Sequence, residues 1–350
     1  MRYGHGVAFS GSITPVAAGE NVGIYLQTSA GLRPVRTVTT KADGSFSSSI
    51  VVTAPGIFVA QGTGAAGNPV ESAPVSLVVR PRFSASIRGS RRIGARLYLV
   101  GRVVPTGAGT VLLTEGNGSR TLKVRPNGRF RTQLTTTLLY RYRATVRLRP
   151  LPGYVARHRT SPVRIRLLPL AIGSRGPAVN WLEYSLLRLH HFALPAVKGV
   201  YDDATADAVL AFEKVHGLPR TGAVSRRFWG VLRTSGPPLA RIRSGNHIEI
   251  DKTRQVLFEV RKGEVVSVSH VSTGATGNTP VGHWHVYSKG LGFNGSGMYD
   301  SLFFVGAFAI HGYHSVPAYP ASHGCVRTPF WFARQIFPRW DVGTSVYVLP

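Results

Sequence analysis

The sequence contains a single cysteine, Cys325, and it lies in the run ASHGCVR at residues 321–327. A lone thiol cannot form an internal disulfide, nor a zinc site that needs several thiolates. Histidines lie two residues before it, at His323, and fourteen residues before it, at His311. An imidazole can take the proton of a thiol and so make the sulfur a nucleophile. These residue types indicate acyl transfer through a cysteine.

Two histidines compete for the role of base. His311 follows the apolar run of residues 303–310, which is typical of a core strand that delivers the next side chain to its edge. We therefore expect His311 to accept the proton, and His323 is the alternative. Gly312 has no side chain, so a group that orients the imidazole there would be a backbone carbonyl. Gly324 allows a close turn that can present its N–H and the next one to a developing oxyanion.

Short segments with alternating apolar and polar residues surround this site. The pattern at residues 247–251, 255–260 and 264–269 predicts strands. Consecutive prolines at 237–238 resist helix formation and indicate a linker before these strands. A β-rich domain of residues 241–350 therefore carries the cysteine and both histidines.

Four short motifs in this domain occur in a recognisable order. Residues 272–274 are STG, 279–282 are TPVG, 311–312 are His-Gly, and 322–327 are Ser-His-Gly-Cys-Val-Arg. The domain closely resembles the L,D-transpeptidase catalytic domain (YkuD type), whose hallmark is an upstream His-Gly followed by Ser-His-Gly-Cys-(Ile/Val)-Arg. The resemblance covers about residues 245–349, and the hallmark is matched at every position.

The resemblance implies roles for single residues. It implies that Cys325 is the acylated nucleophile and His311 the general base, and that three neighbours shape the pocket: His323, Gly324 and Arg327. We expect four further residues to contact the substrate: Tyr299, Gly312, Tyr313 and Ser322. The chemistry that the family implies uses no cofactor and no metal.

The implied reaction has two steps and acts on peptidoglycan stem peptides. The cysteine attacks the carbonyl of the third stem residue, a diamino acid, and expels the terminal D-alanine. A side-chain amine of a neighbouring stem then resolves the thioester and leaves a 3→3 cross-link. Water competes in this second step, so L,D-carboxypeptidase trimming is an alternative outcome. Carbapenem-type lactams are expected to acylate the same thiol.

Residues 170–234 change to a helical period. Apolar residues recur at helical spacing in 177–189 and 203–216, and a third helix is expected after Ser225. With the runs GVYD at 199–202 and HGL at 216–218, this order resembles the three-helix peptidoglycan-binding domain. Glu213 departs from the glutamine that is usual in that family. The resemblance implies that this domain binds peptidoglycan.

The first half of the chain has few helix-compatible runs, and it repeats itself. Three motifs return at offsets of 90, 84 and 88 residues: FSGSITP at 9–15 as LVGRVVP, DGSF at 43–46 as NGRF, and SAPV at 72–75 as TSPV. Two β-sandwiches are therefore predicted, at residues 1–80 and 81–168, and they resemble bacterial immunoglobulin-like modules. Because neither copy has a catalytic constellation, we interpret them as spacers or adhesive arms. The predicted fold class is thus multidomain and mainly β.

The net charge of +27 is concentrated in one module. Residues 81–168 contain 19 Lys and Arg and a single acid, Glu115, so anionic wall polymers are possible partners. Many of these arginines alternate with apolar residues, which is also typical of a solvated sheet face. Specific nucleic-acid binding is not expected, because stacking aromatics and a recognition helix are missing.

Two features of the sequence bear on location. No stretch approaches the roughly 18–20 apolar residues of a membrane helix. The first residues also lack the positive start and apolar run of a secretory signal. We therefore expect an extracytoplasmic, wall-associated protein whose export signal is not in this chain.

Two other functions compete with acyl transfer. A zinc hydrolase could be built on five histidines: His283, His285, His311, His314 and His323. Only one acid, Asp300, lies near them, and the cysteine motif already explains two of them. A non-catalytic wall-binding protein is the stronger competitor, and in it the thiol of Cys325 would be inert.

Overall fold

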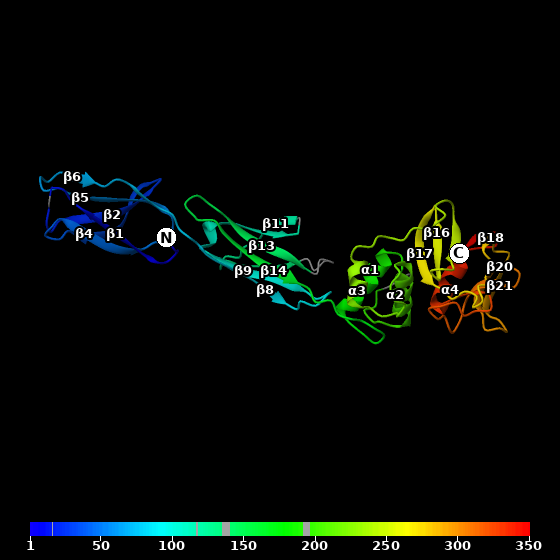
Figure 1. The fold of residues 1–350 in the computed structure, drawn as a ribbon. Coiled ribbons are helices and arrows are strands. Elements are labelled where there is room, and N and C mark those ends of the chain that lie inside the picture. Colours follow the sequence, from blue (N-terminus) through cyan, green and yellow to red (C-terminus); the bar gives the residue numbers. More distant parts are fainter. Residues whose placement is uncertain (16, 117, 135–140, 192–196) are drawn as a thin grey trace. The chain divides into compact units, whose positions relative to one another are not determined.

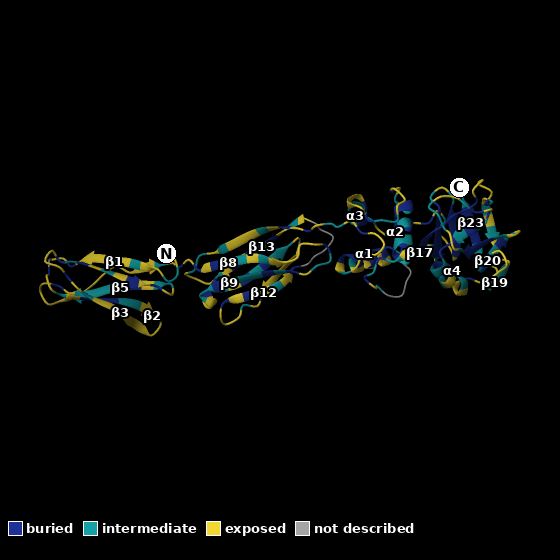
Figure 2. Ribbon diagram, turned by 90° about the horizontal axis from the view of Figure 1, so that it is seen from below, coloured by how far each residue is buried: buried dark blue, intermediate teal, exposed yellow. Residues whose placement is uncertain are grey.

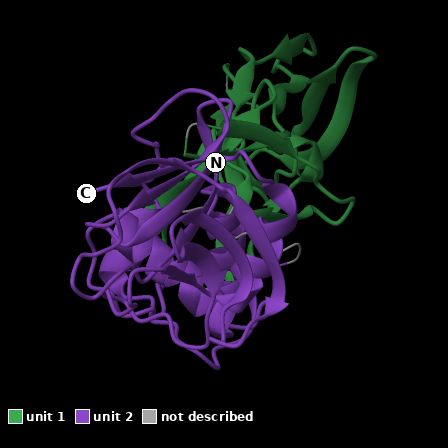
Figure 3. Ribbon diagram, turned by 90° about the vertical axis from the view of Figure 1, so that its right-hand side faces the viewer, with its two compact units in different colours: residues 1–91, 96–135, 141–164 green, residues 92–95, 136–140, 165–350 purple. Residues whose placement is uncertain are grey.

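The structure, a computed structural model, describes residues 1–15, 17–116, 118–134, 141–191 and 197–350. The chain forms two compact units, shown in Figure 3. Unit 1 comprises residues 1–91, 96–135 and 141–164, and unit 2 comprises residues 92–95, 136–140 and 165–350. The chain is mainly β, as predicted, and the helices belong largely to unit 2 (Figure 1).

Unit 1 begins with a β-sandwich. One sheet has two strands, β1 (Gly6–Ser12) and β4 (Ser45–Val51). The facing sheet has five strands: β3 (Gly31–Thr39), β2 (Asn21–Thr28), β5 (Gly56–Thr63), β6 (Pro69–Glu71) and β7 (Val75–Leu77). Both β6 and β7 pair with β5. Apolar side chains from both sheets form the core between them, including Ile24, Ile50 and Phe58.

The second sandwich of unit 1 repeats this plan. Its first sheet has three strands: β12 (Arg129–Leu134), β9 (Leu97–Val104) and β8 (Arg82–Gly89). Its second sheet has four: β11 (Gly118–Leu122), β10 (Gly109–Glu115), β13 (Arg141–Pro150) and β14 (Arg157–Arg164). A short 3-10 turn, η1 (Thr106–Ala108), precedes β10. The predicted repeat is visible in the register, since Gly11 faces Phe46 in the first copy and Gly101 faces Phe130 in the second.

The arginines of β13 lie on the outer face of its sheet. Arg143 and Arg147 are exposed, whereas Ala144, Val146 and Leu148 between and beside them are buried (Figure 2). This alternation is the period-2 pattern of a strand with one solvated face. Much of the positive charge of this module therefore covers a sheet surface.

Unit 2 begins with a three-helix region. Its helices are α1 (Pro177–Arg188), α2 (Asp203–Val215) and α3 (Arg226–Leu232). Asp202 caps α2 by accepting the N–H of Thr205, and Ser225 caps α3 by accepting the N–H of Phe228. The helical spacing correctly predicts the buried face, which includes Val179, Leu182, Leu186, Phe212 and Phe228.

Glu213, the departure from the expected glutamine, has a structural role. Its buried carboxylate accepts the N–H groups of Thr221 and Gly222, at 2.7 and 2.8 Å, and the Thr221 hydroxyl at 2.8 Å. Three donors converge on an acceptor-only group, which suits a carboxylate better than an amide. Glu213 therefore holds the turn that follows α2.

Two sheets and a short helix form the C-terminal part of unit 2. One sheet has the order β17 (Glu264–His270), β16 (Val256–Arg261), β15 (His247–Asp251), β23 (Ser345–Leu349) and β18 (Gly282–His285). The other has the order β19 (Ser288–Phe293), β20 (Tyr299–Val305), β21 (Phe308–Gly312) and β22 (Val326–Thr328). Helix α4 (Phe330–Ile336) and the 3-10 turn η2 (Phe337–Arg339) follow β22. Ile248, Leu302, Ile310, Val326 and Phe332 belong to one buried core.

Helix α2 packs on this C-terminal part, although the prolines at 237–238 predict a linker between the helices and the sheets. Ala211 of α2 shares a buried apolar cluster with Phe258 of β16 and Val268 of β17. Lys214 is 2% exposed, and its Nζ donates to the carbonyls of Gln255 at 3.1 Å and Val271 at 2.9 Å. Burial lowers the pKa of Lys214 to about 7. Helix α2 and the strands β16 and β17 thus share one interior.

Asp207 of α2 adds two further bonds to this contact. Its carboxylate accepts from Trp331 Nε1 at 2.7 Å and lies 2.9 Å from His270 Nε2. Burial lowers the pKa of His270, and the bond to Asp207 opposes that shift. The acid therefore ties α2 to both β17 and α4.

This shared interior predicts that the C-terminal part depends on the helices. A fragment of residues 236–350 should be less stable than residues 165–350 by roughly 2 kcal/mol or more, because the apolar face of β16 and β17 becomes exposed. Thermal unfolding of the two fragments, followed by circular dichroism, measures the difference. Equal melting temperatures would contradict the packing described above.

None of the helices in the described ranges has the length and apolar character of a membrane span.

Candidate active site

Cys325 lies immediately before β22, which runs parallel to β21. The register pairs Ile310 with Val326 and His311 with Arg327. Because Ile310 and Val326 point into the core, the alternate residues His311 and Arg327 lie on the other face of the sheet. Cys325 precedes Val326 and so shares that face. The parallel pair thus places the predicted nucleophile and the predicted base on one surface.

The thiol of Cys325 contacts the turn between β20 and β21. Its Sγ lies 3.8 Å from the carbonyl oxygen of Ala307, to which the thiol donates, and the backbone N–H of Ala309 bonds to the sulfur. Burial raises the pKa of the thiol, while the Ala309 N–H and the charge of Arg327 lower it in part. The net direction is upward, so the resting group is a thiol rather than a thiolate.

His311 is buried, and its ring is held by the backbone. Nδ1 lies 2.9 Å from the carbonyl oxygen of Gly312. A carbonyl only accepts, so Nδ1 carries the proton and Nε2 keeps its lone pair. This is the carbonyl contact expected from the glycine that follows. Burial lowers the pKa of His311, which the Gly312 bond opposes and Arg327 reinforces, so the imidazole is neutral near pH 7.

Arg327 lies beside both groups and is itself stacked. Its guanidinium carbon is 4.2 Å from the centroid of the Tyr313 ring. That ring meets the His311 ring edge-on, with centroids 5.7 Å apart. The charge of Arg327 lowers the pKa of Cys325 and of His311 alike. Tyr313 thus positions Arg327, whose charge favours the thiolate form of Cys325 and the neutral form of His311.

The turn that presents Cys325 is held by two hydroxyls. Ser322 Oγ donates to the carbonyl of Cys325 at 2.5 Å and accepts the N–H of Gly324 at 3.0 Å. Thr279 Oγ1 donates to the carbonyl of Gly324 at 2.7 Å. The expectation that the Gly324 N–H faces an oxyanion is therefore wrong, because Ser322 already accepts it. In the described part of the chain nothing accepts from the Cys325 N–H, which stays the candidate donor.

Gly324 is required at this turn for steric reasons. Its φ is +132°, and a Cβ there would meet the ring of Phe308 at 2.1 Å. Ser322 is buried and its hydroxyl is bonded on both sides, so it shapes the turn rather than presenting a free group. Thr279 belongs to the TPVG run at residues 279–282. The sequence did not indicate that its hydroxyl would hold this turn. The anchors of the nucleophile are thus a serine and a threonine.

Three other predicted site residues make contacts of their own. The side chain of His323 is exposed, and its backbone carbonyl accepts from Asn278 Nδ2 at 2.8 Å. Tyr299 pairs with Gly312 across β20 and β21, and its ring lies 4.8 Å from that of Phe293. Gly312 is buried beneath α4, where a Cβ would meet Ala333 and Phe330 at 2.9 Å. Gly312 therefore allows close packing of α4 and orients His311.

A loop of residues 313–321 borders the site and is held at two carbonyls. Ser272 Oγ donates to the carbonyl of Tyr319 at 2.7 Å. Arg220, from the three-helix region, donates to the carbonyl of Ala318 at 2.9 Å and to that of Thr253 at 3.2 Å. The sequence did not indicate this role for Arg220. The three-helix region thus contacts the loop that follows His311 and Gly312.

Two regions of the chain match family models. Residues 245–348 match the L,D-transpeptidase catalytic domain, and residues 175–232 match a putative peptidoglycan binding domain. A solved L,D-transpeptidase from Xylanimonas cellulosilytica is 33% identical, and the match covers 51% of this chain and 97% of that one, with a TM-score of 0.49. Residues 245–348 belong to the L,D-transpeptidase family.

A second solved L,D-transpeptidase, from Stackebrandtia nassauensis, is 22% identical, and the match covers 52% of this chain and 95% of that one, with a TM-score of 0.33. No curated protein matches the chain. The two family models cover the motif around the cysteine and the region of helices before it, respectively.

The two histidines of β18 in this L,D-transpeptidase domain are engaged elsewhere. His283 stacks on Tyr347, with ring centroids 4.2 Å apart, and its Nε2 lies 3.2 Å from Ser345 Oγ. His285 is its neighbour on β18, with ring centroids 4.7 Å apart. Across the described ranges, no three His, Cys, Asp or Glu side chains gather where one metal ion could bind them. The five histidines of the zinc alternative are not brought together.

The direction of the two pKa shifts predicts the pH dependence of the L,D-transpeptidase reaction. If His311 is the base, it acts in its neutral form, and its lowered pKa keeps it neutral below the usual 6.5. We expect kcat/KM to stay level from pH 8 to about 6.5 and to fall tenfold per unit only in more acidic solution. The raised pKa of Cys325 adds no rise between pH 7 and 8. A rate that climbs steadily from pH 6 to 9 would instead indicate a thiolate formed before substrate attack.

Proposed function

We propose that the chain is a peptidoglycan L,D-transpeptidase that forms 3→3 cross-links through Cys325. The observation that carries the proposal is the state of His311, whose Nδ1 is bonded to the Gly312 carbonyl so that Nε2 is a free base on the face shared with Cys325. The family match supports an acyl-transfer enzyme. The lowered pKa of His311 and the raised pKa of Cys325 favour a neutral pair in the resting site.

The first step transfers an acyl group from the donor stem to sulfur. As Sγ of Cys325 attacks the carbonyl carbon of the third stem residue, its proton moves to His311 Nε2 and the carbonyl oxygen becomes an oxyanion. The Cys325 N–H is the candidate donor to that oxyanion. The C–N bond then breaks, and His311 returns the proton to the amine of the departing D-alanine. The product is a thioester with a neutral imidazole.

The second step uses the same base in the opposite direction. The side-chain amine of a neighbouring stem attacks the thioester carbon, and His311 takes the proton that the amine loses. The C–S bond breaks, and the proton returns to the sulfur of Cys325. Water in place of the amine gives a trimmed stem, so trimming is the second candidate outcome of the same site.

The three-helix region supports peptidoglycan as the polymer that carries these stems. It matches a peptidoglycan-binding family model and contacts the loop beside the site through Arg220. We therefore assign the protein to the outside of the cytoplasmic membrane, in association with the wall. For the basic module of residues 81–168 we propose anionic wall polymers as partners, a binding that must weaken steeply with salt.

Incubation with a tetrapeptide stem tests the proposal. Mass spectrometry should show a thioester on Cys325, release of D-alanine, and a dimer joined between two third residues. A carbapenem should add one adduct to the same residue. A tripeptide product without dimer would assign trimming instead. A protein that stays unmodified by both compounds would support the non-catalytic wall-binding alternative.

A further inference from the structure

The loop of residues 313–321 joins the candidate base to the turn that presents the nucleophile. In the chain it follows the pair His311-Gly312 and precedes Ser322, whose hydroxyl holds the turn of the cysteine. Residues 314–320 belong to no helix or strand. The position of their main chain therefore depends on contacts that other segments make with it.

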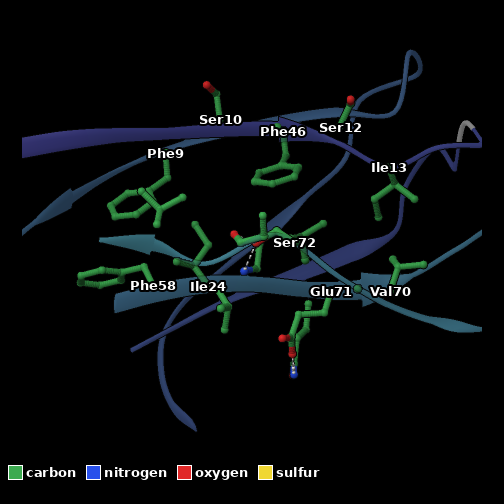
Figure 4. A pocket seen from close by; sticks show the side chains of 18 of the residues that line it. Phe9, Ser10, Ser12, Ile13, Ile24, Phe46, Phe58, Val70, Glu71 and Ser72 are labelled. Atoms are coloured by element: carbon green, nitrogen blue, oxygen red, sulfur yellow. Dashed lines mark hydrogen bonds between the residues drawn. The ribbon is translucent and has the colours of Figure 1, made fainter. Parts of the chain in front are cut away.

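One connection between strands in the first sandwich is held locally. In the segment between β6 and β7, the Ser72 hydroxyl accepts the N–H of Ala60 at 3.0 Å (Figure 4). Ala60 belongs to β5, the strand with which β6 and β7 both pair. The 313–321 loop differs, since its middle is held by side chains from outside the two strands that it joins.

Two side chains hold the middle of this loop. Arg220 Nη1 donates to the carbonyl of Ala318 at 2.9 Å, and Ser272 Oγ donates to the carbonyl of Tyr319 at 2.7 Å. Arg220 also donates to the carbonyl of Thr253 at 3.2 Å, so its guanidinium joins the loop to the turn between β15 and β16. Hydrogen bonds from a charged donor are stronger than those between neutral groups. The loop is therefore fixed at two consecutive carbonyls.

The support at Ser272 depends in turn on helix α2. Lys214 is almost fully buried, and its Nζ donates to the carbonyl of Val271, the residue before Ser272, at 2.9 Å. The N–H and the carbonyl of Ser272 both pair with the main chain of Arg327, at 3.0 Å each. Lys214 thus fixes the segment that connects the loop with Arg327.

The position of Arg220 is set by Glu213, which also belongs to α2. The Glu213 carboxylate accepts the N–H groups of Thr221 and Gly222, which directly follow Arg220. The turn that carries the guanidinium is therefore anchored one residue from Lys214 in the sequence. Both supports of the loop are thus connected to the same end of α2.

The loop itself carries two tyrosines. Tyr313, at its start, lies edge-on to the His311 ring and under the guanidinium of Arg327. Tyr319 is 64% exposed, although Ser272 holds its carbonyl. Aromatic side chains provide a large contact area at a low cost in conformational entropy. The loop therefore places one aromatic ring at the site and exposes a second one that a ligand can contact.

We propose that Lys214 and Arg220 are positioning residues for the stem peptide, because they fix the 313–321 loop as the surface that contacts the bound stem. The proposal rests on the proposed function and extends it by assigning substrate placement to the helical region. The nucleophile is anchored separately, by the hydroxyls of Ser322 and Thr279. Displacing the loop should therefore weaken stem binding and leave the reactivity of the thiol unchanged.

Steady-state kinetics of Arg220→Ala in the full chain test the proposal. KM for a tetrapeptide stem should rise about tenfold while kcat changes by less than about threefold, because the loop moves and the reacting groups do not. Alkylation of Cys325 by iodoacetamide should keep the wild-type rate. Arg220→Lys can still donate to one carbonyl, so it should recover part of the loss. Arg227→Ala is the matched control, since Arg227 of α3 is also exposed and lies outside these contacts, and it should equal wild type.

Hydrogen exchange gives a second readout that needs no substrate. The amides of residues 313–321 should exchange faster in Arg220→Ala than in wild type, while thermal unfolding stays nearly unchanged. Lys214→Met keeps an apolar stem without the donors, and it should speed exchange in the same loop. Unchanged exchange in both variants, or a KM for Arg220→Ala equal to that of an active wild type, overturns the positioning role alone. A wild-type chain that releases no D-alanine overturns the proposed function, and the substrate role of the loop with it.

Discussion

Replacing Cys325 by serine is expected to lower the rate of stem-peptide acyl transfer by about a thousandfold or more. The sulfur lies between the Ala307 carbonyl and the Ala309 N–H, and a serine hydroxyl can occupy the same place without new bulk. A hydroxyl is a far weaker acid than a thiol, so a neutral His311 cannot take its proton as readily. Release of D-alanine from a tetrapeptide stem, measured under single-turnover conditions, gives the rate.

The control for this experiment is built into the sequence. Because Cys325 is the single cysteine, a thiol reagent or a carbapenem that labels the wild-type chain should leave Cys325→Ser unlabelled. Thermal unfolding should be nearly unchanged, since the thiol donates one long hydrogen bond, at 3.8 Å, and a serine hydroxyl can still accept the Ala309 N–H. A serine variant that keeps a rate within tenfold of wild type would exclude the thiol as nucleophile.

The local geometry of the site could be predicted from the sequence where it depends on neighbours in the chain. The motif around Cys325 predicts the nucleophile, and the apolar run before His311 correctly predicts a core strand, β21, that ends at His311 and Gly312. The glycine after His311 leaves a carbonyl as the only local partner for Nδ1, and the structure has that bond. Helix caps at Asp202 and Ser225 are also local signals.

Other features depend on residues far apart in the chain and left no such signal. The Gly324 N–H was expected to face substrate, but the Ser322 hydroxyl accepts it, a competition that only the folded turn decides. Lys214 and Arg220 look like surface residues of a helical domain, yet they donate to carbonyls of Val271 and Ala318. The prolines at 237 and 238 lie between α3 and β15, in a segment that has neither helix nor strand. They carry no information about whether two domains then pack.

The same distinction applies to the first sandwich. The repeat offsets predict equivalent strands, and the pairs of Gly11 with Phe46 and Gly101 with Phe130 confirm them. Which strand has a partner at its second edge is a property of the sheet, and only the structure shows that β1 pairs with β4 alone among the described strands. Local pattern thus predicts elements and reactive groups, whereas edges and interfaces follow from the complete fold.

Replacing His311 by glutamine is expected to lower kcat/KM for the stem peptide by about a hundredfold to ten-thousandfold. The glutamine amide can still donate toward the Gly312 carbonyl, but it has no basic nitrogen to receive the thiol proton. The matched change at His323 should cost little, because that side chain is exposed and lies outside the bonds that hold Cys325. Both variants are to be assayed by D-alanine release from pH 5 to pH 9.

The pH profile separates a lost base from a disturbed pocket. In His311→Gln the fall in kcat/KM below about pH 6.5 should disappear, since the group whose protonation stops the reaction is gone. The residual rate should then rise with pH toward the raised pKa of Cys325, because only preformed thiolate can attack. His323→Gln should keep the acidic fall. The opposite result, an acidic fall that vanishes in His323→Gln and persists in His311→Gln, would assign the base to His323. His311 would then have only a structural role at the end of β21.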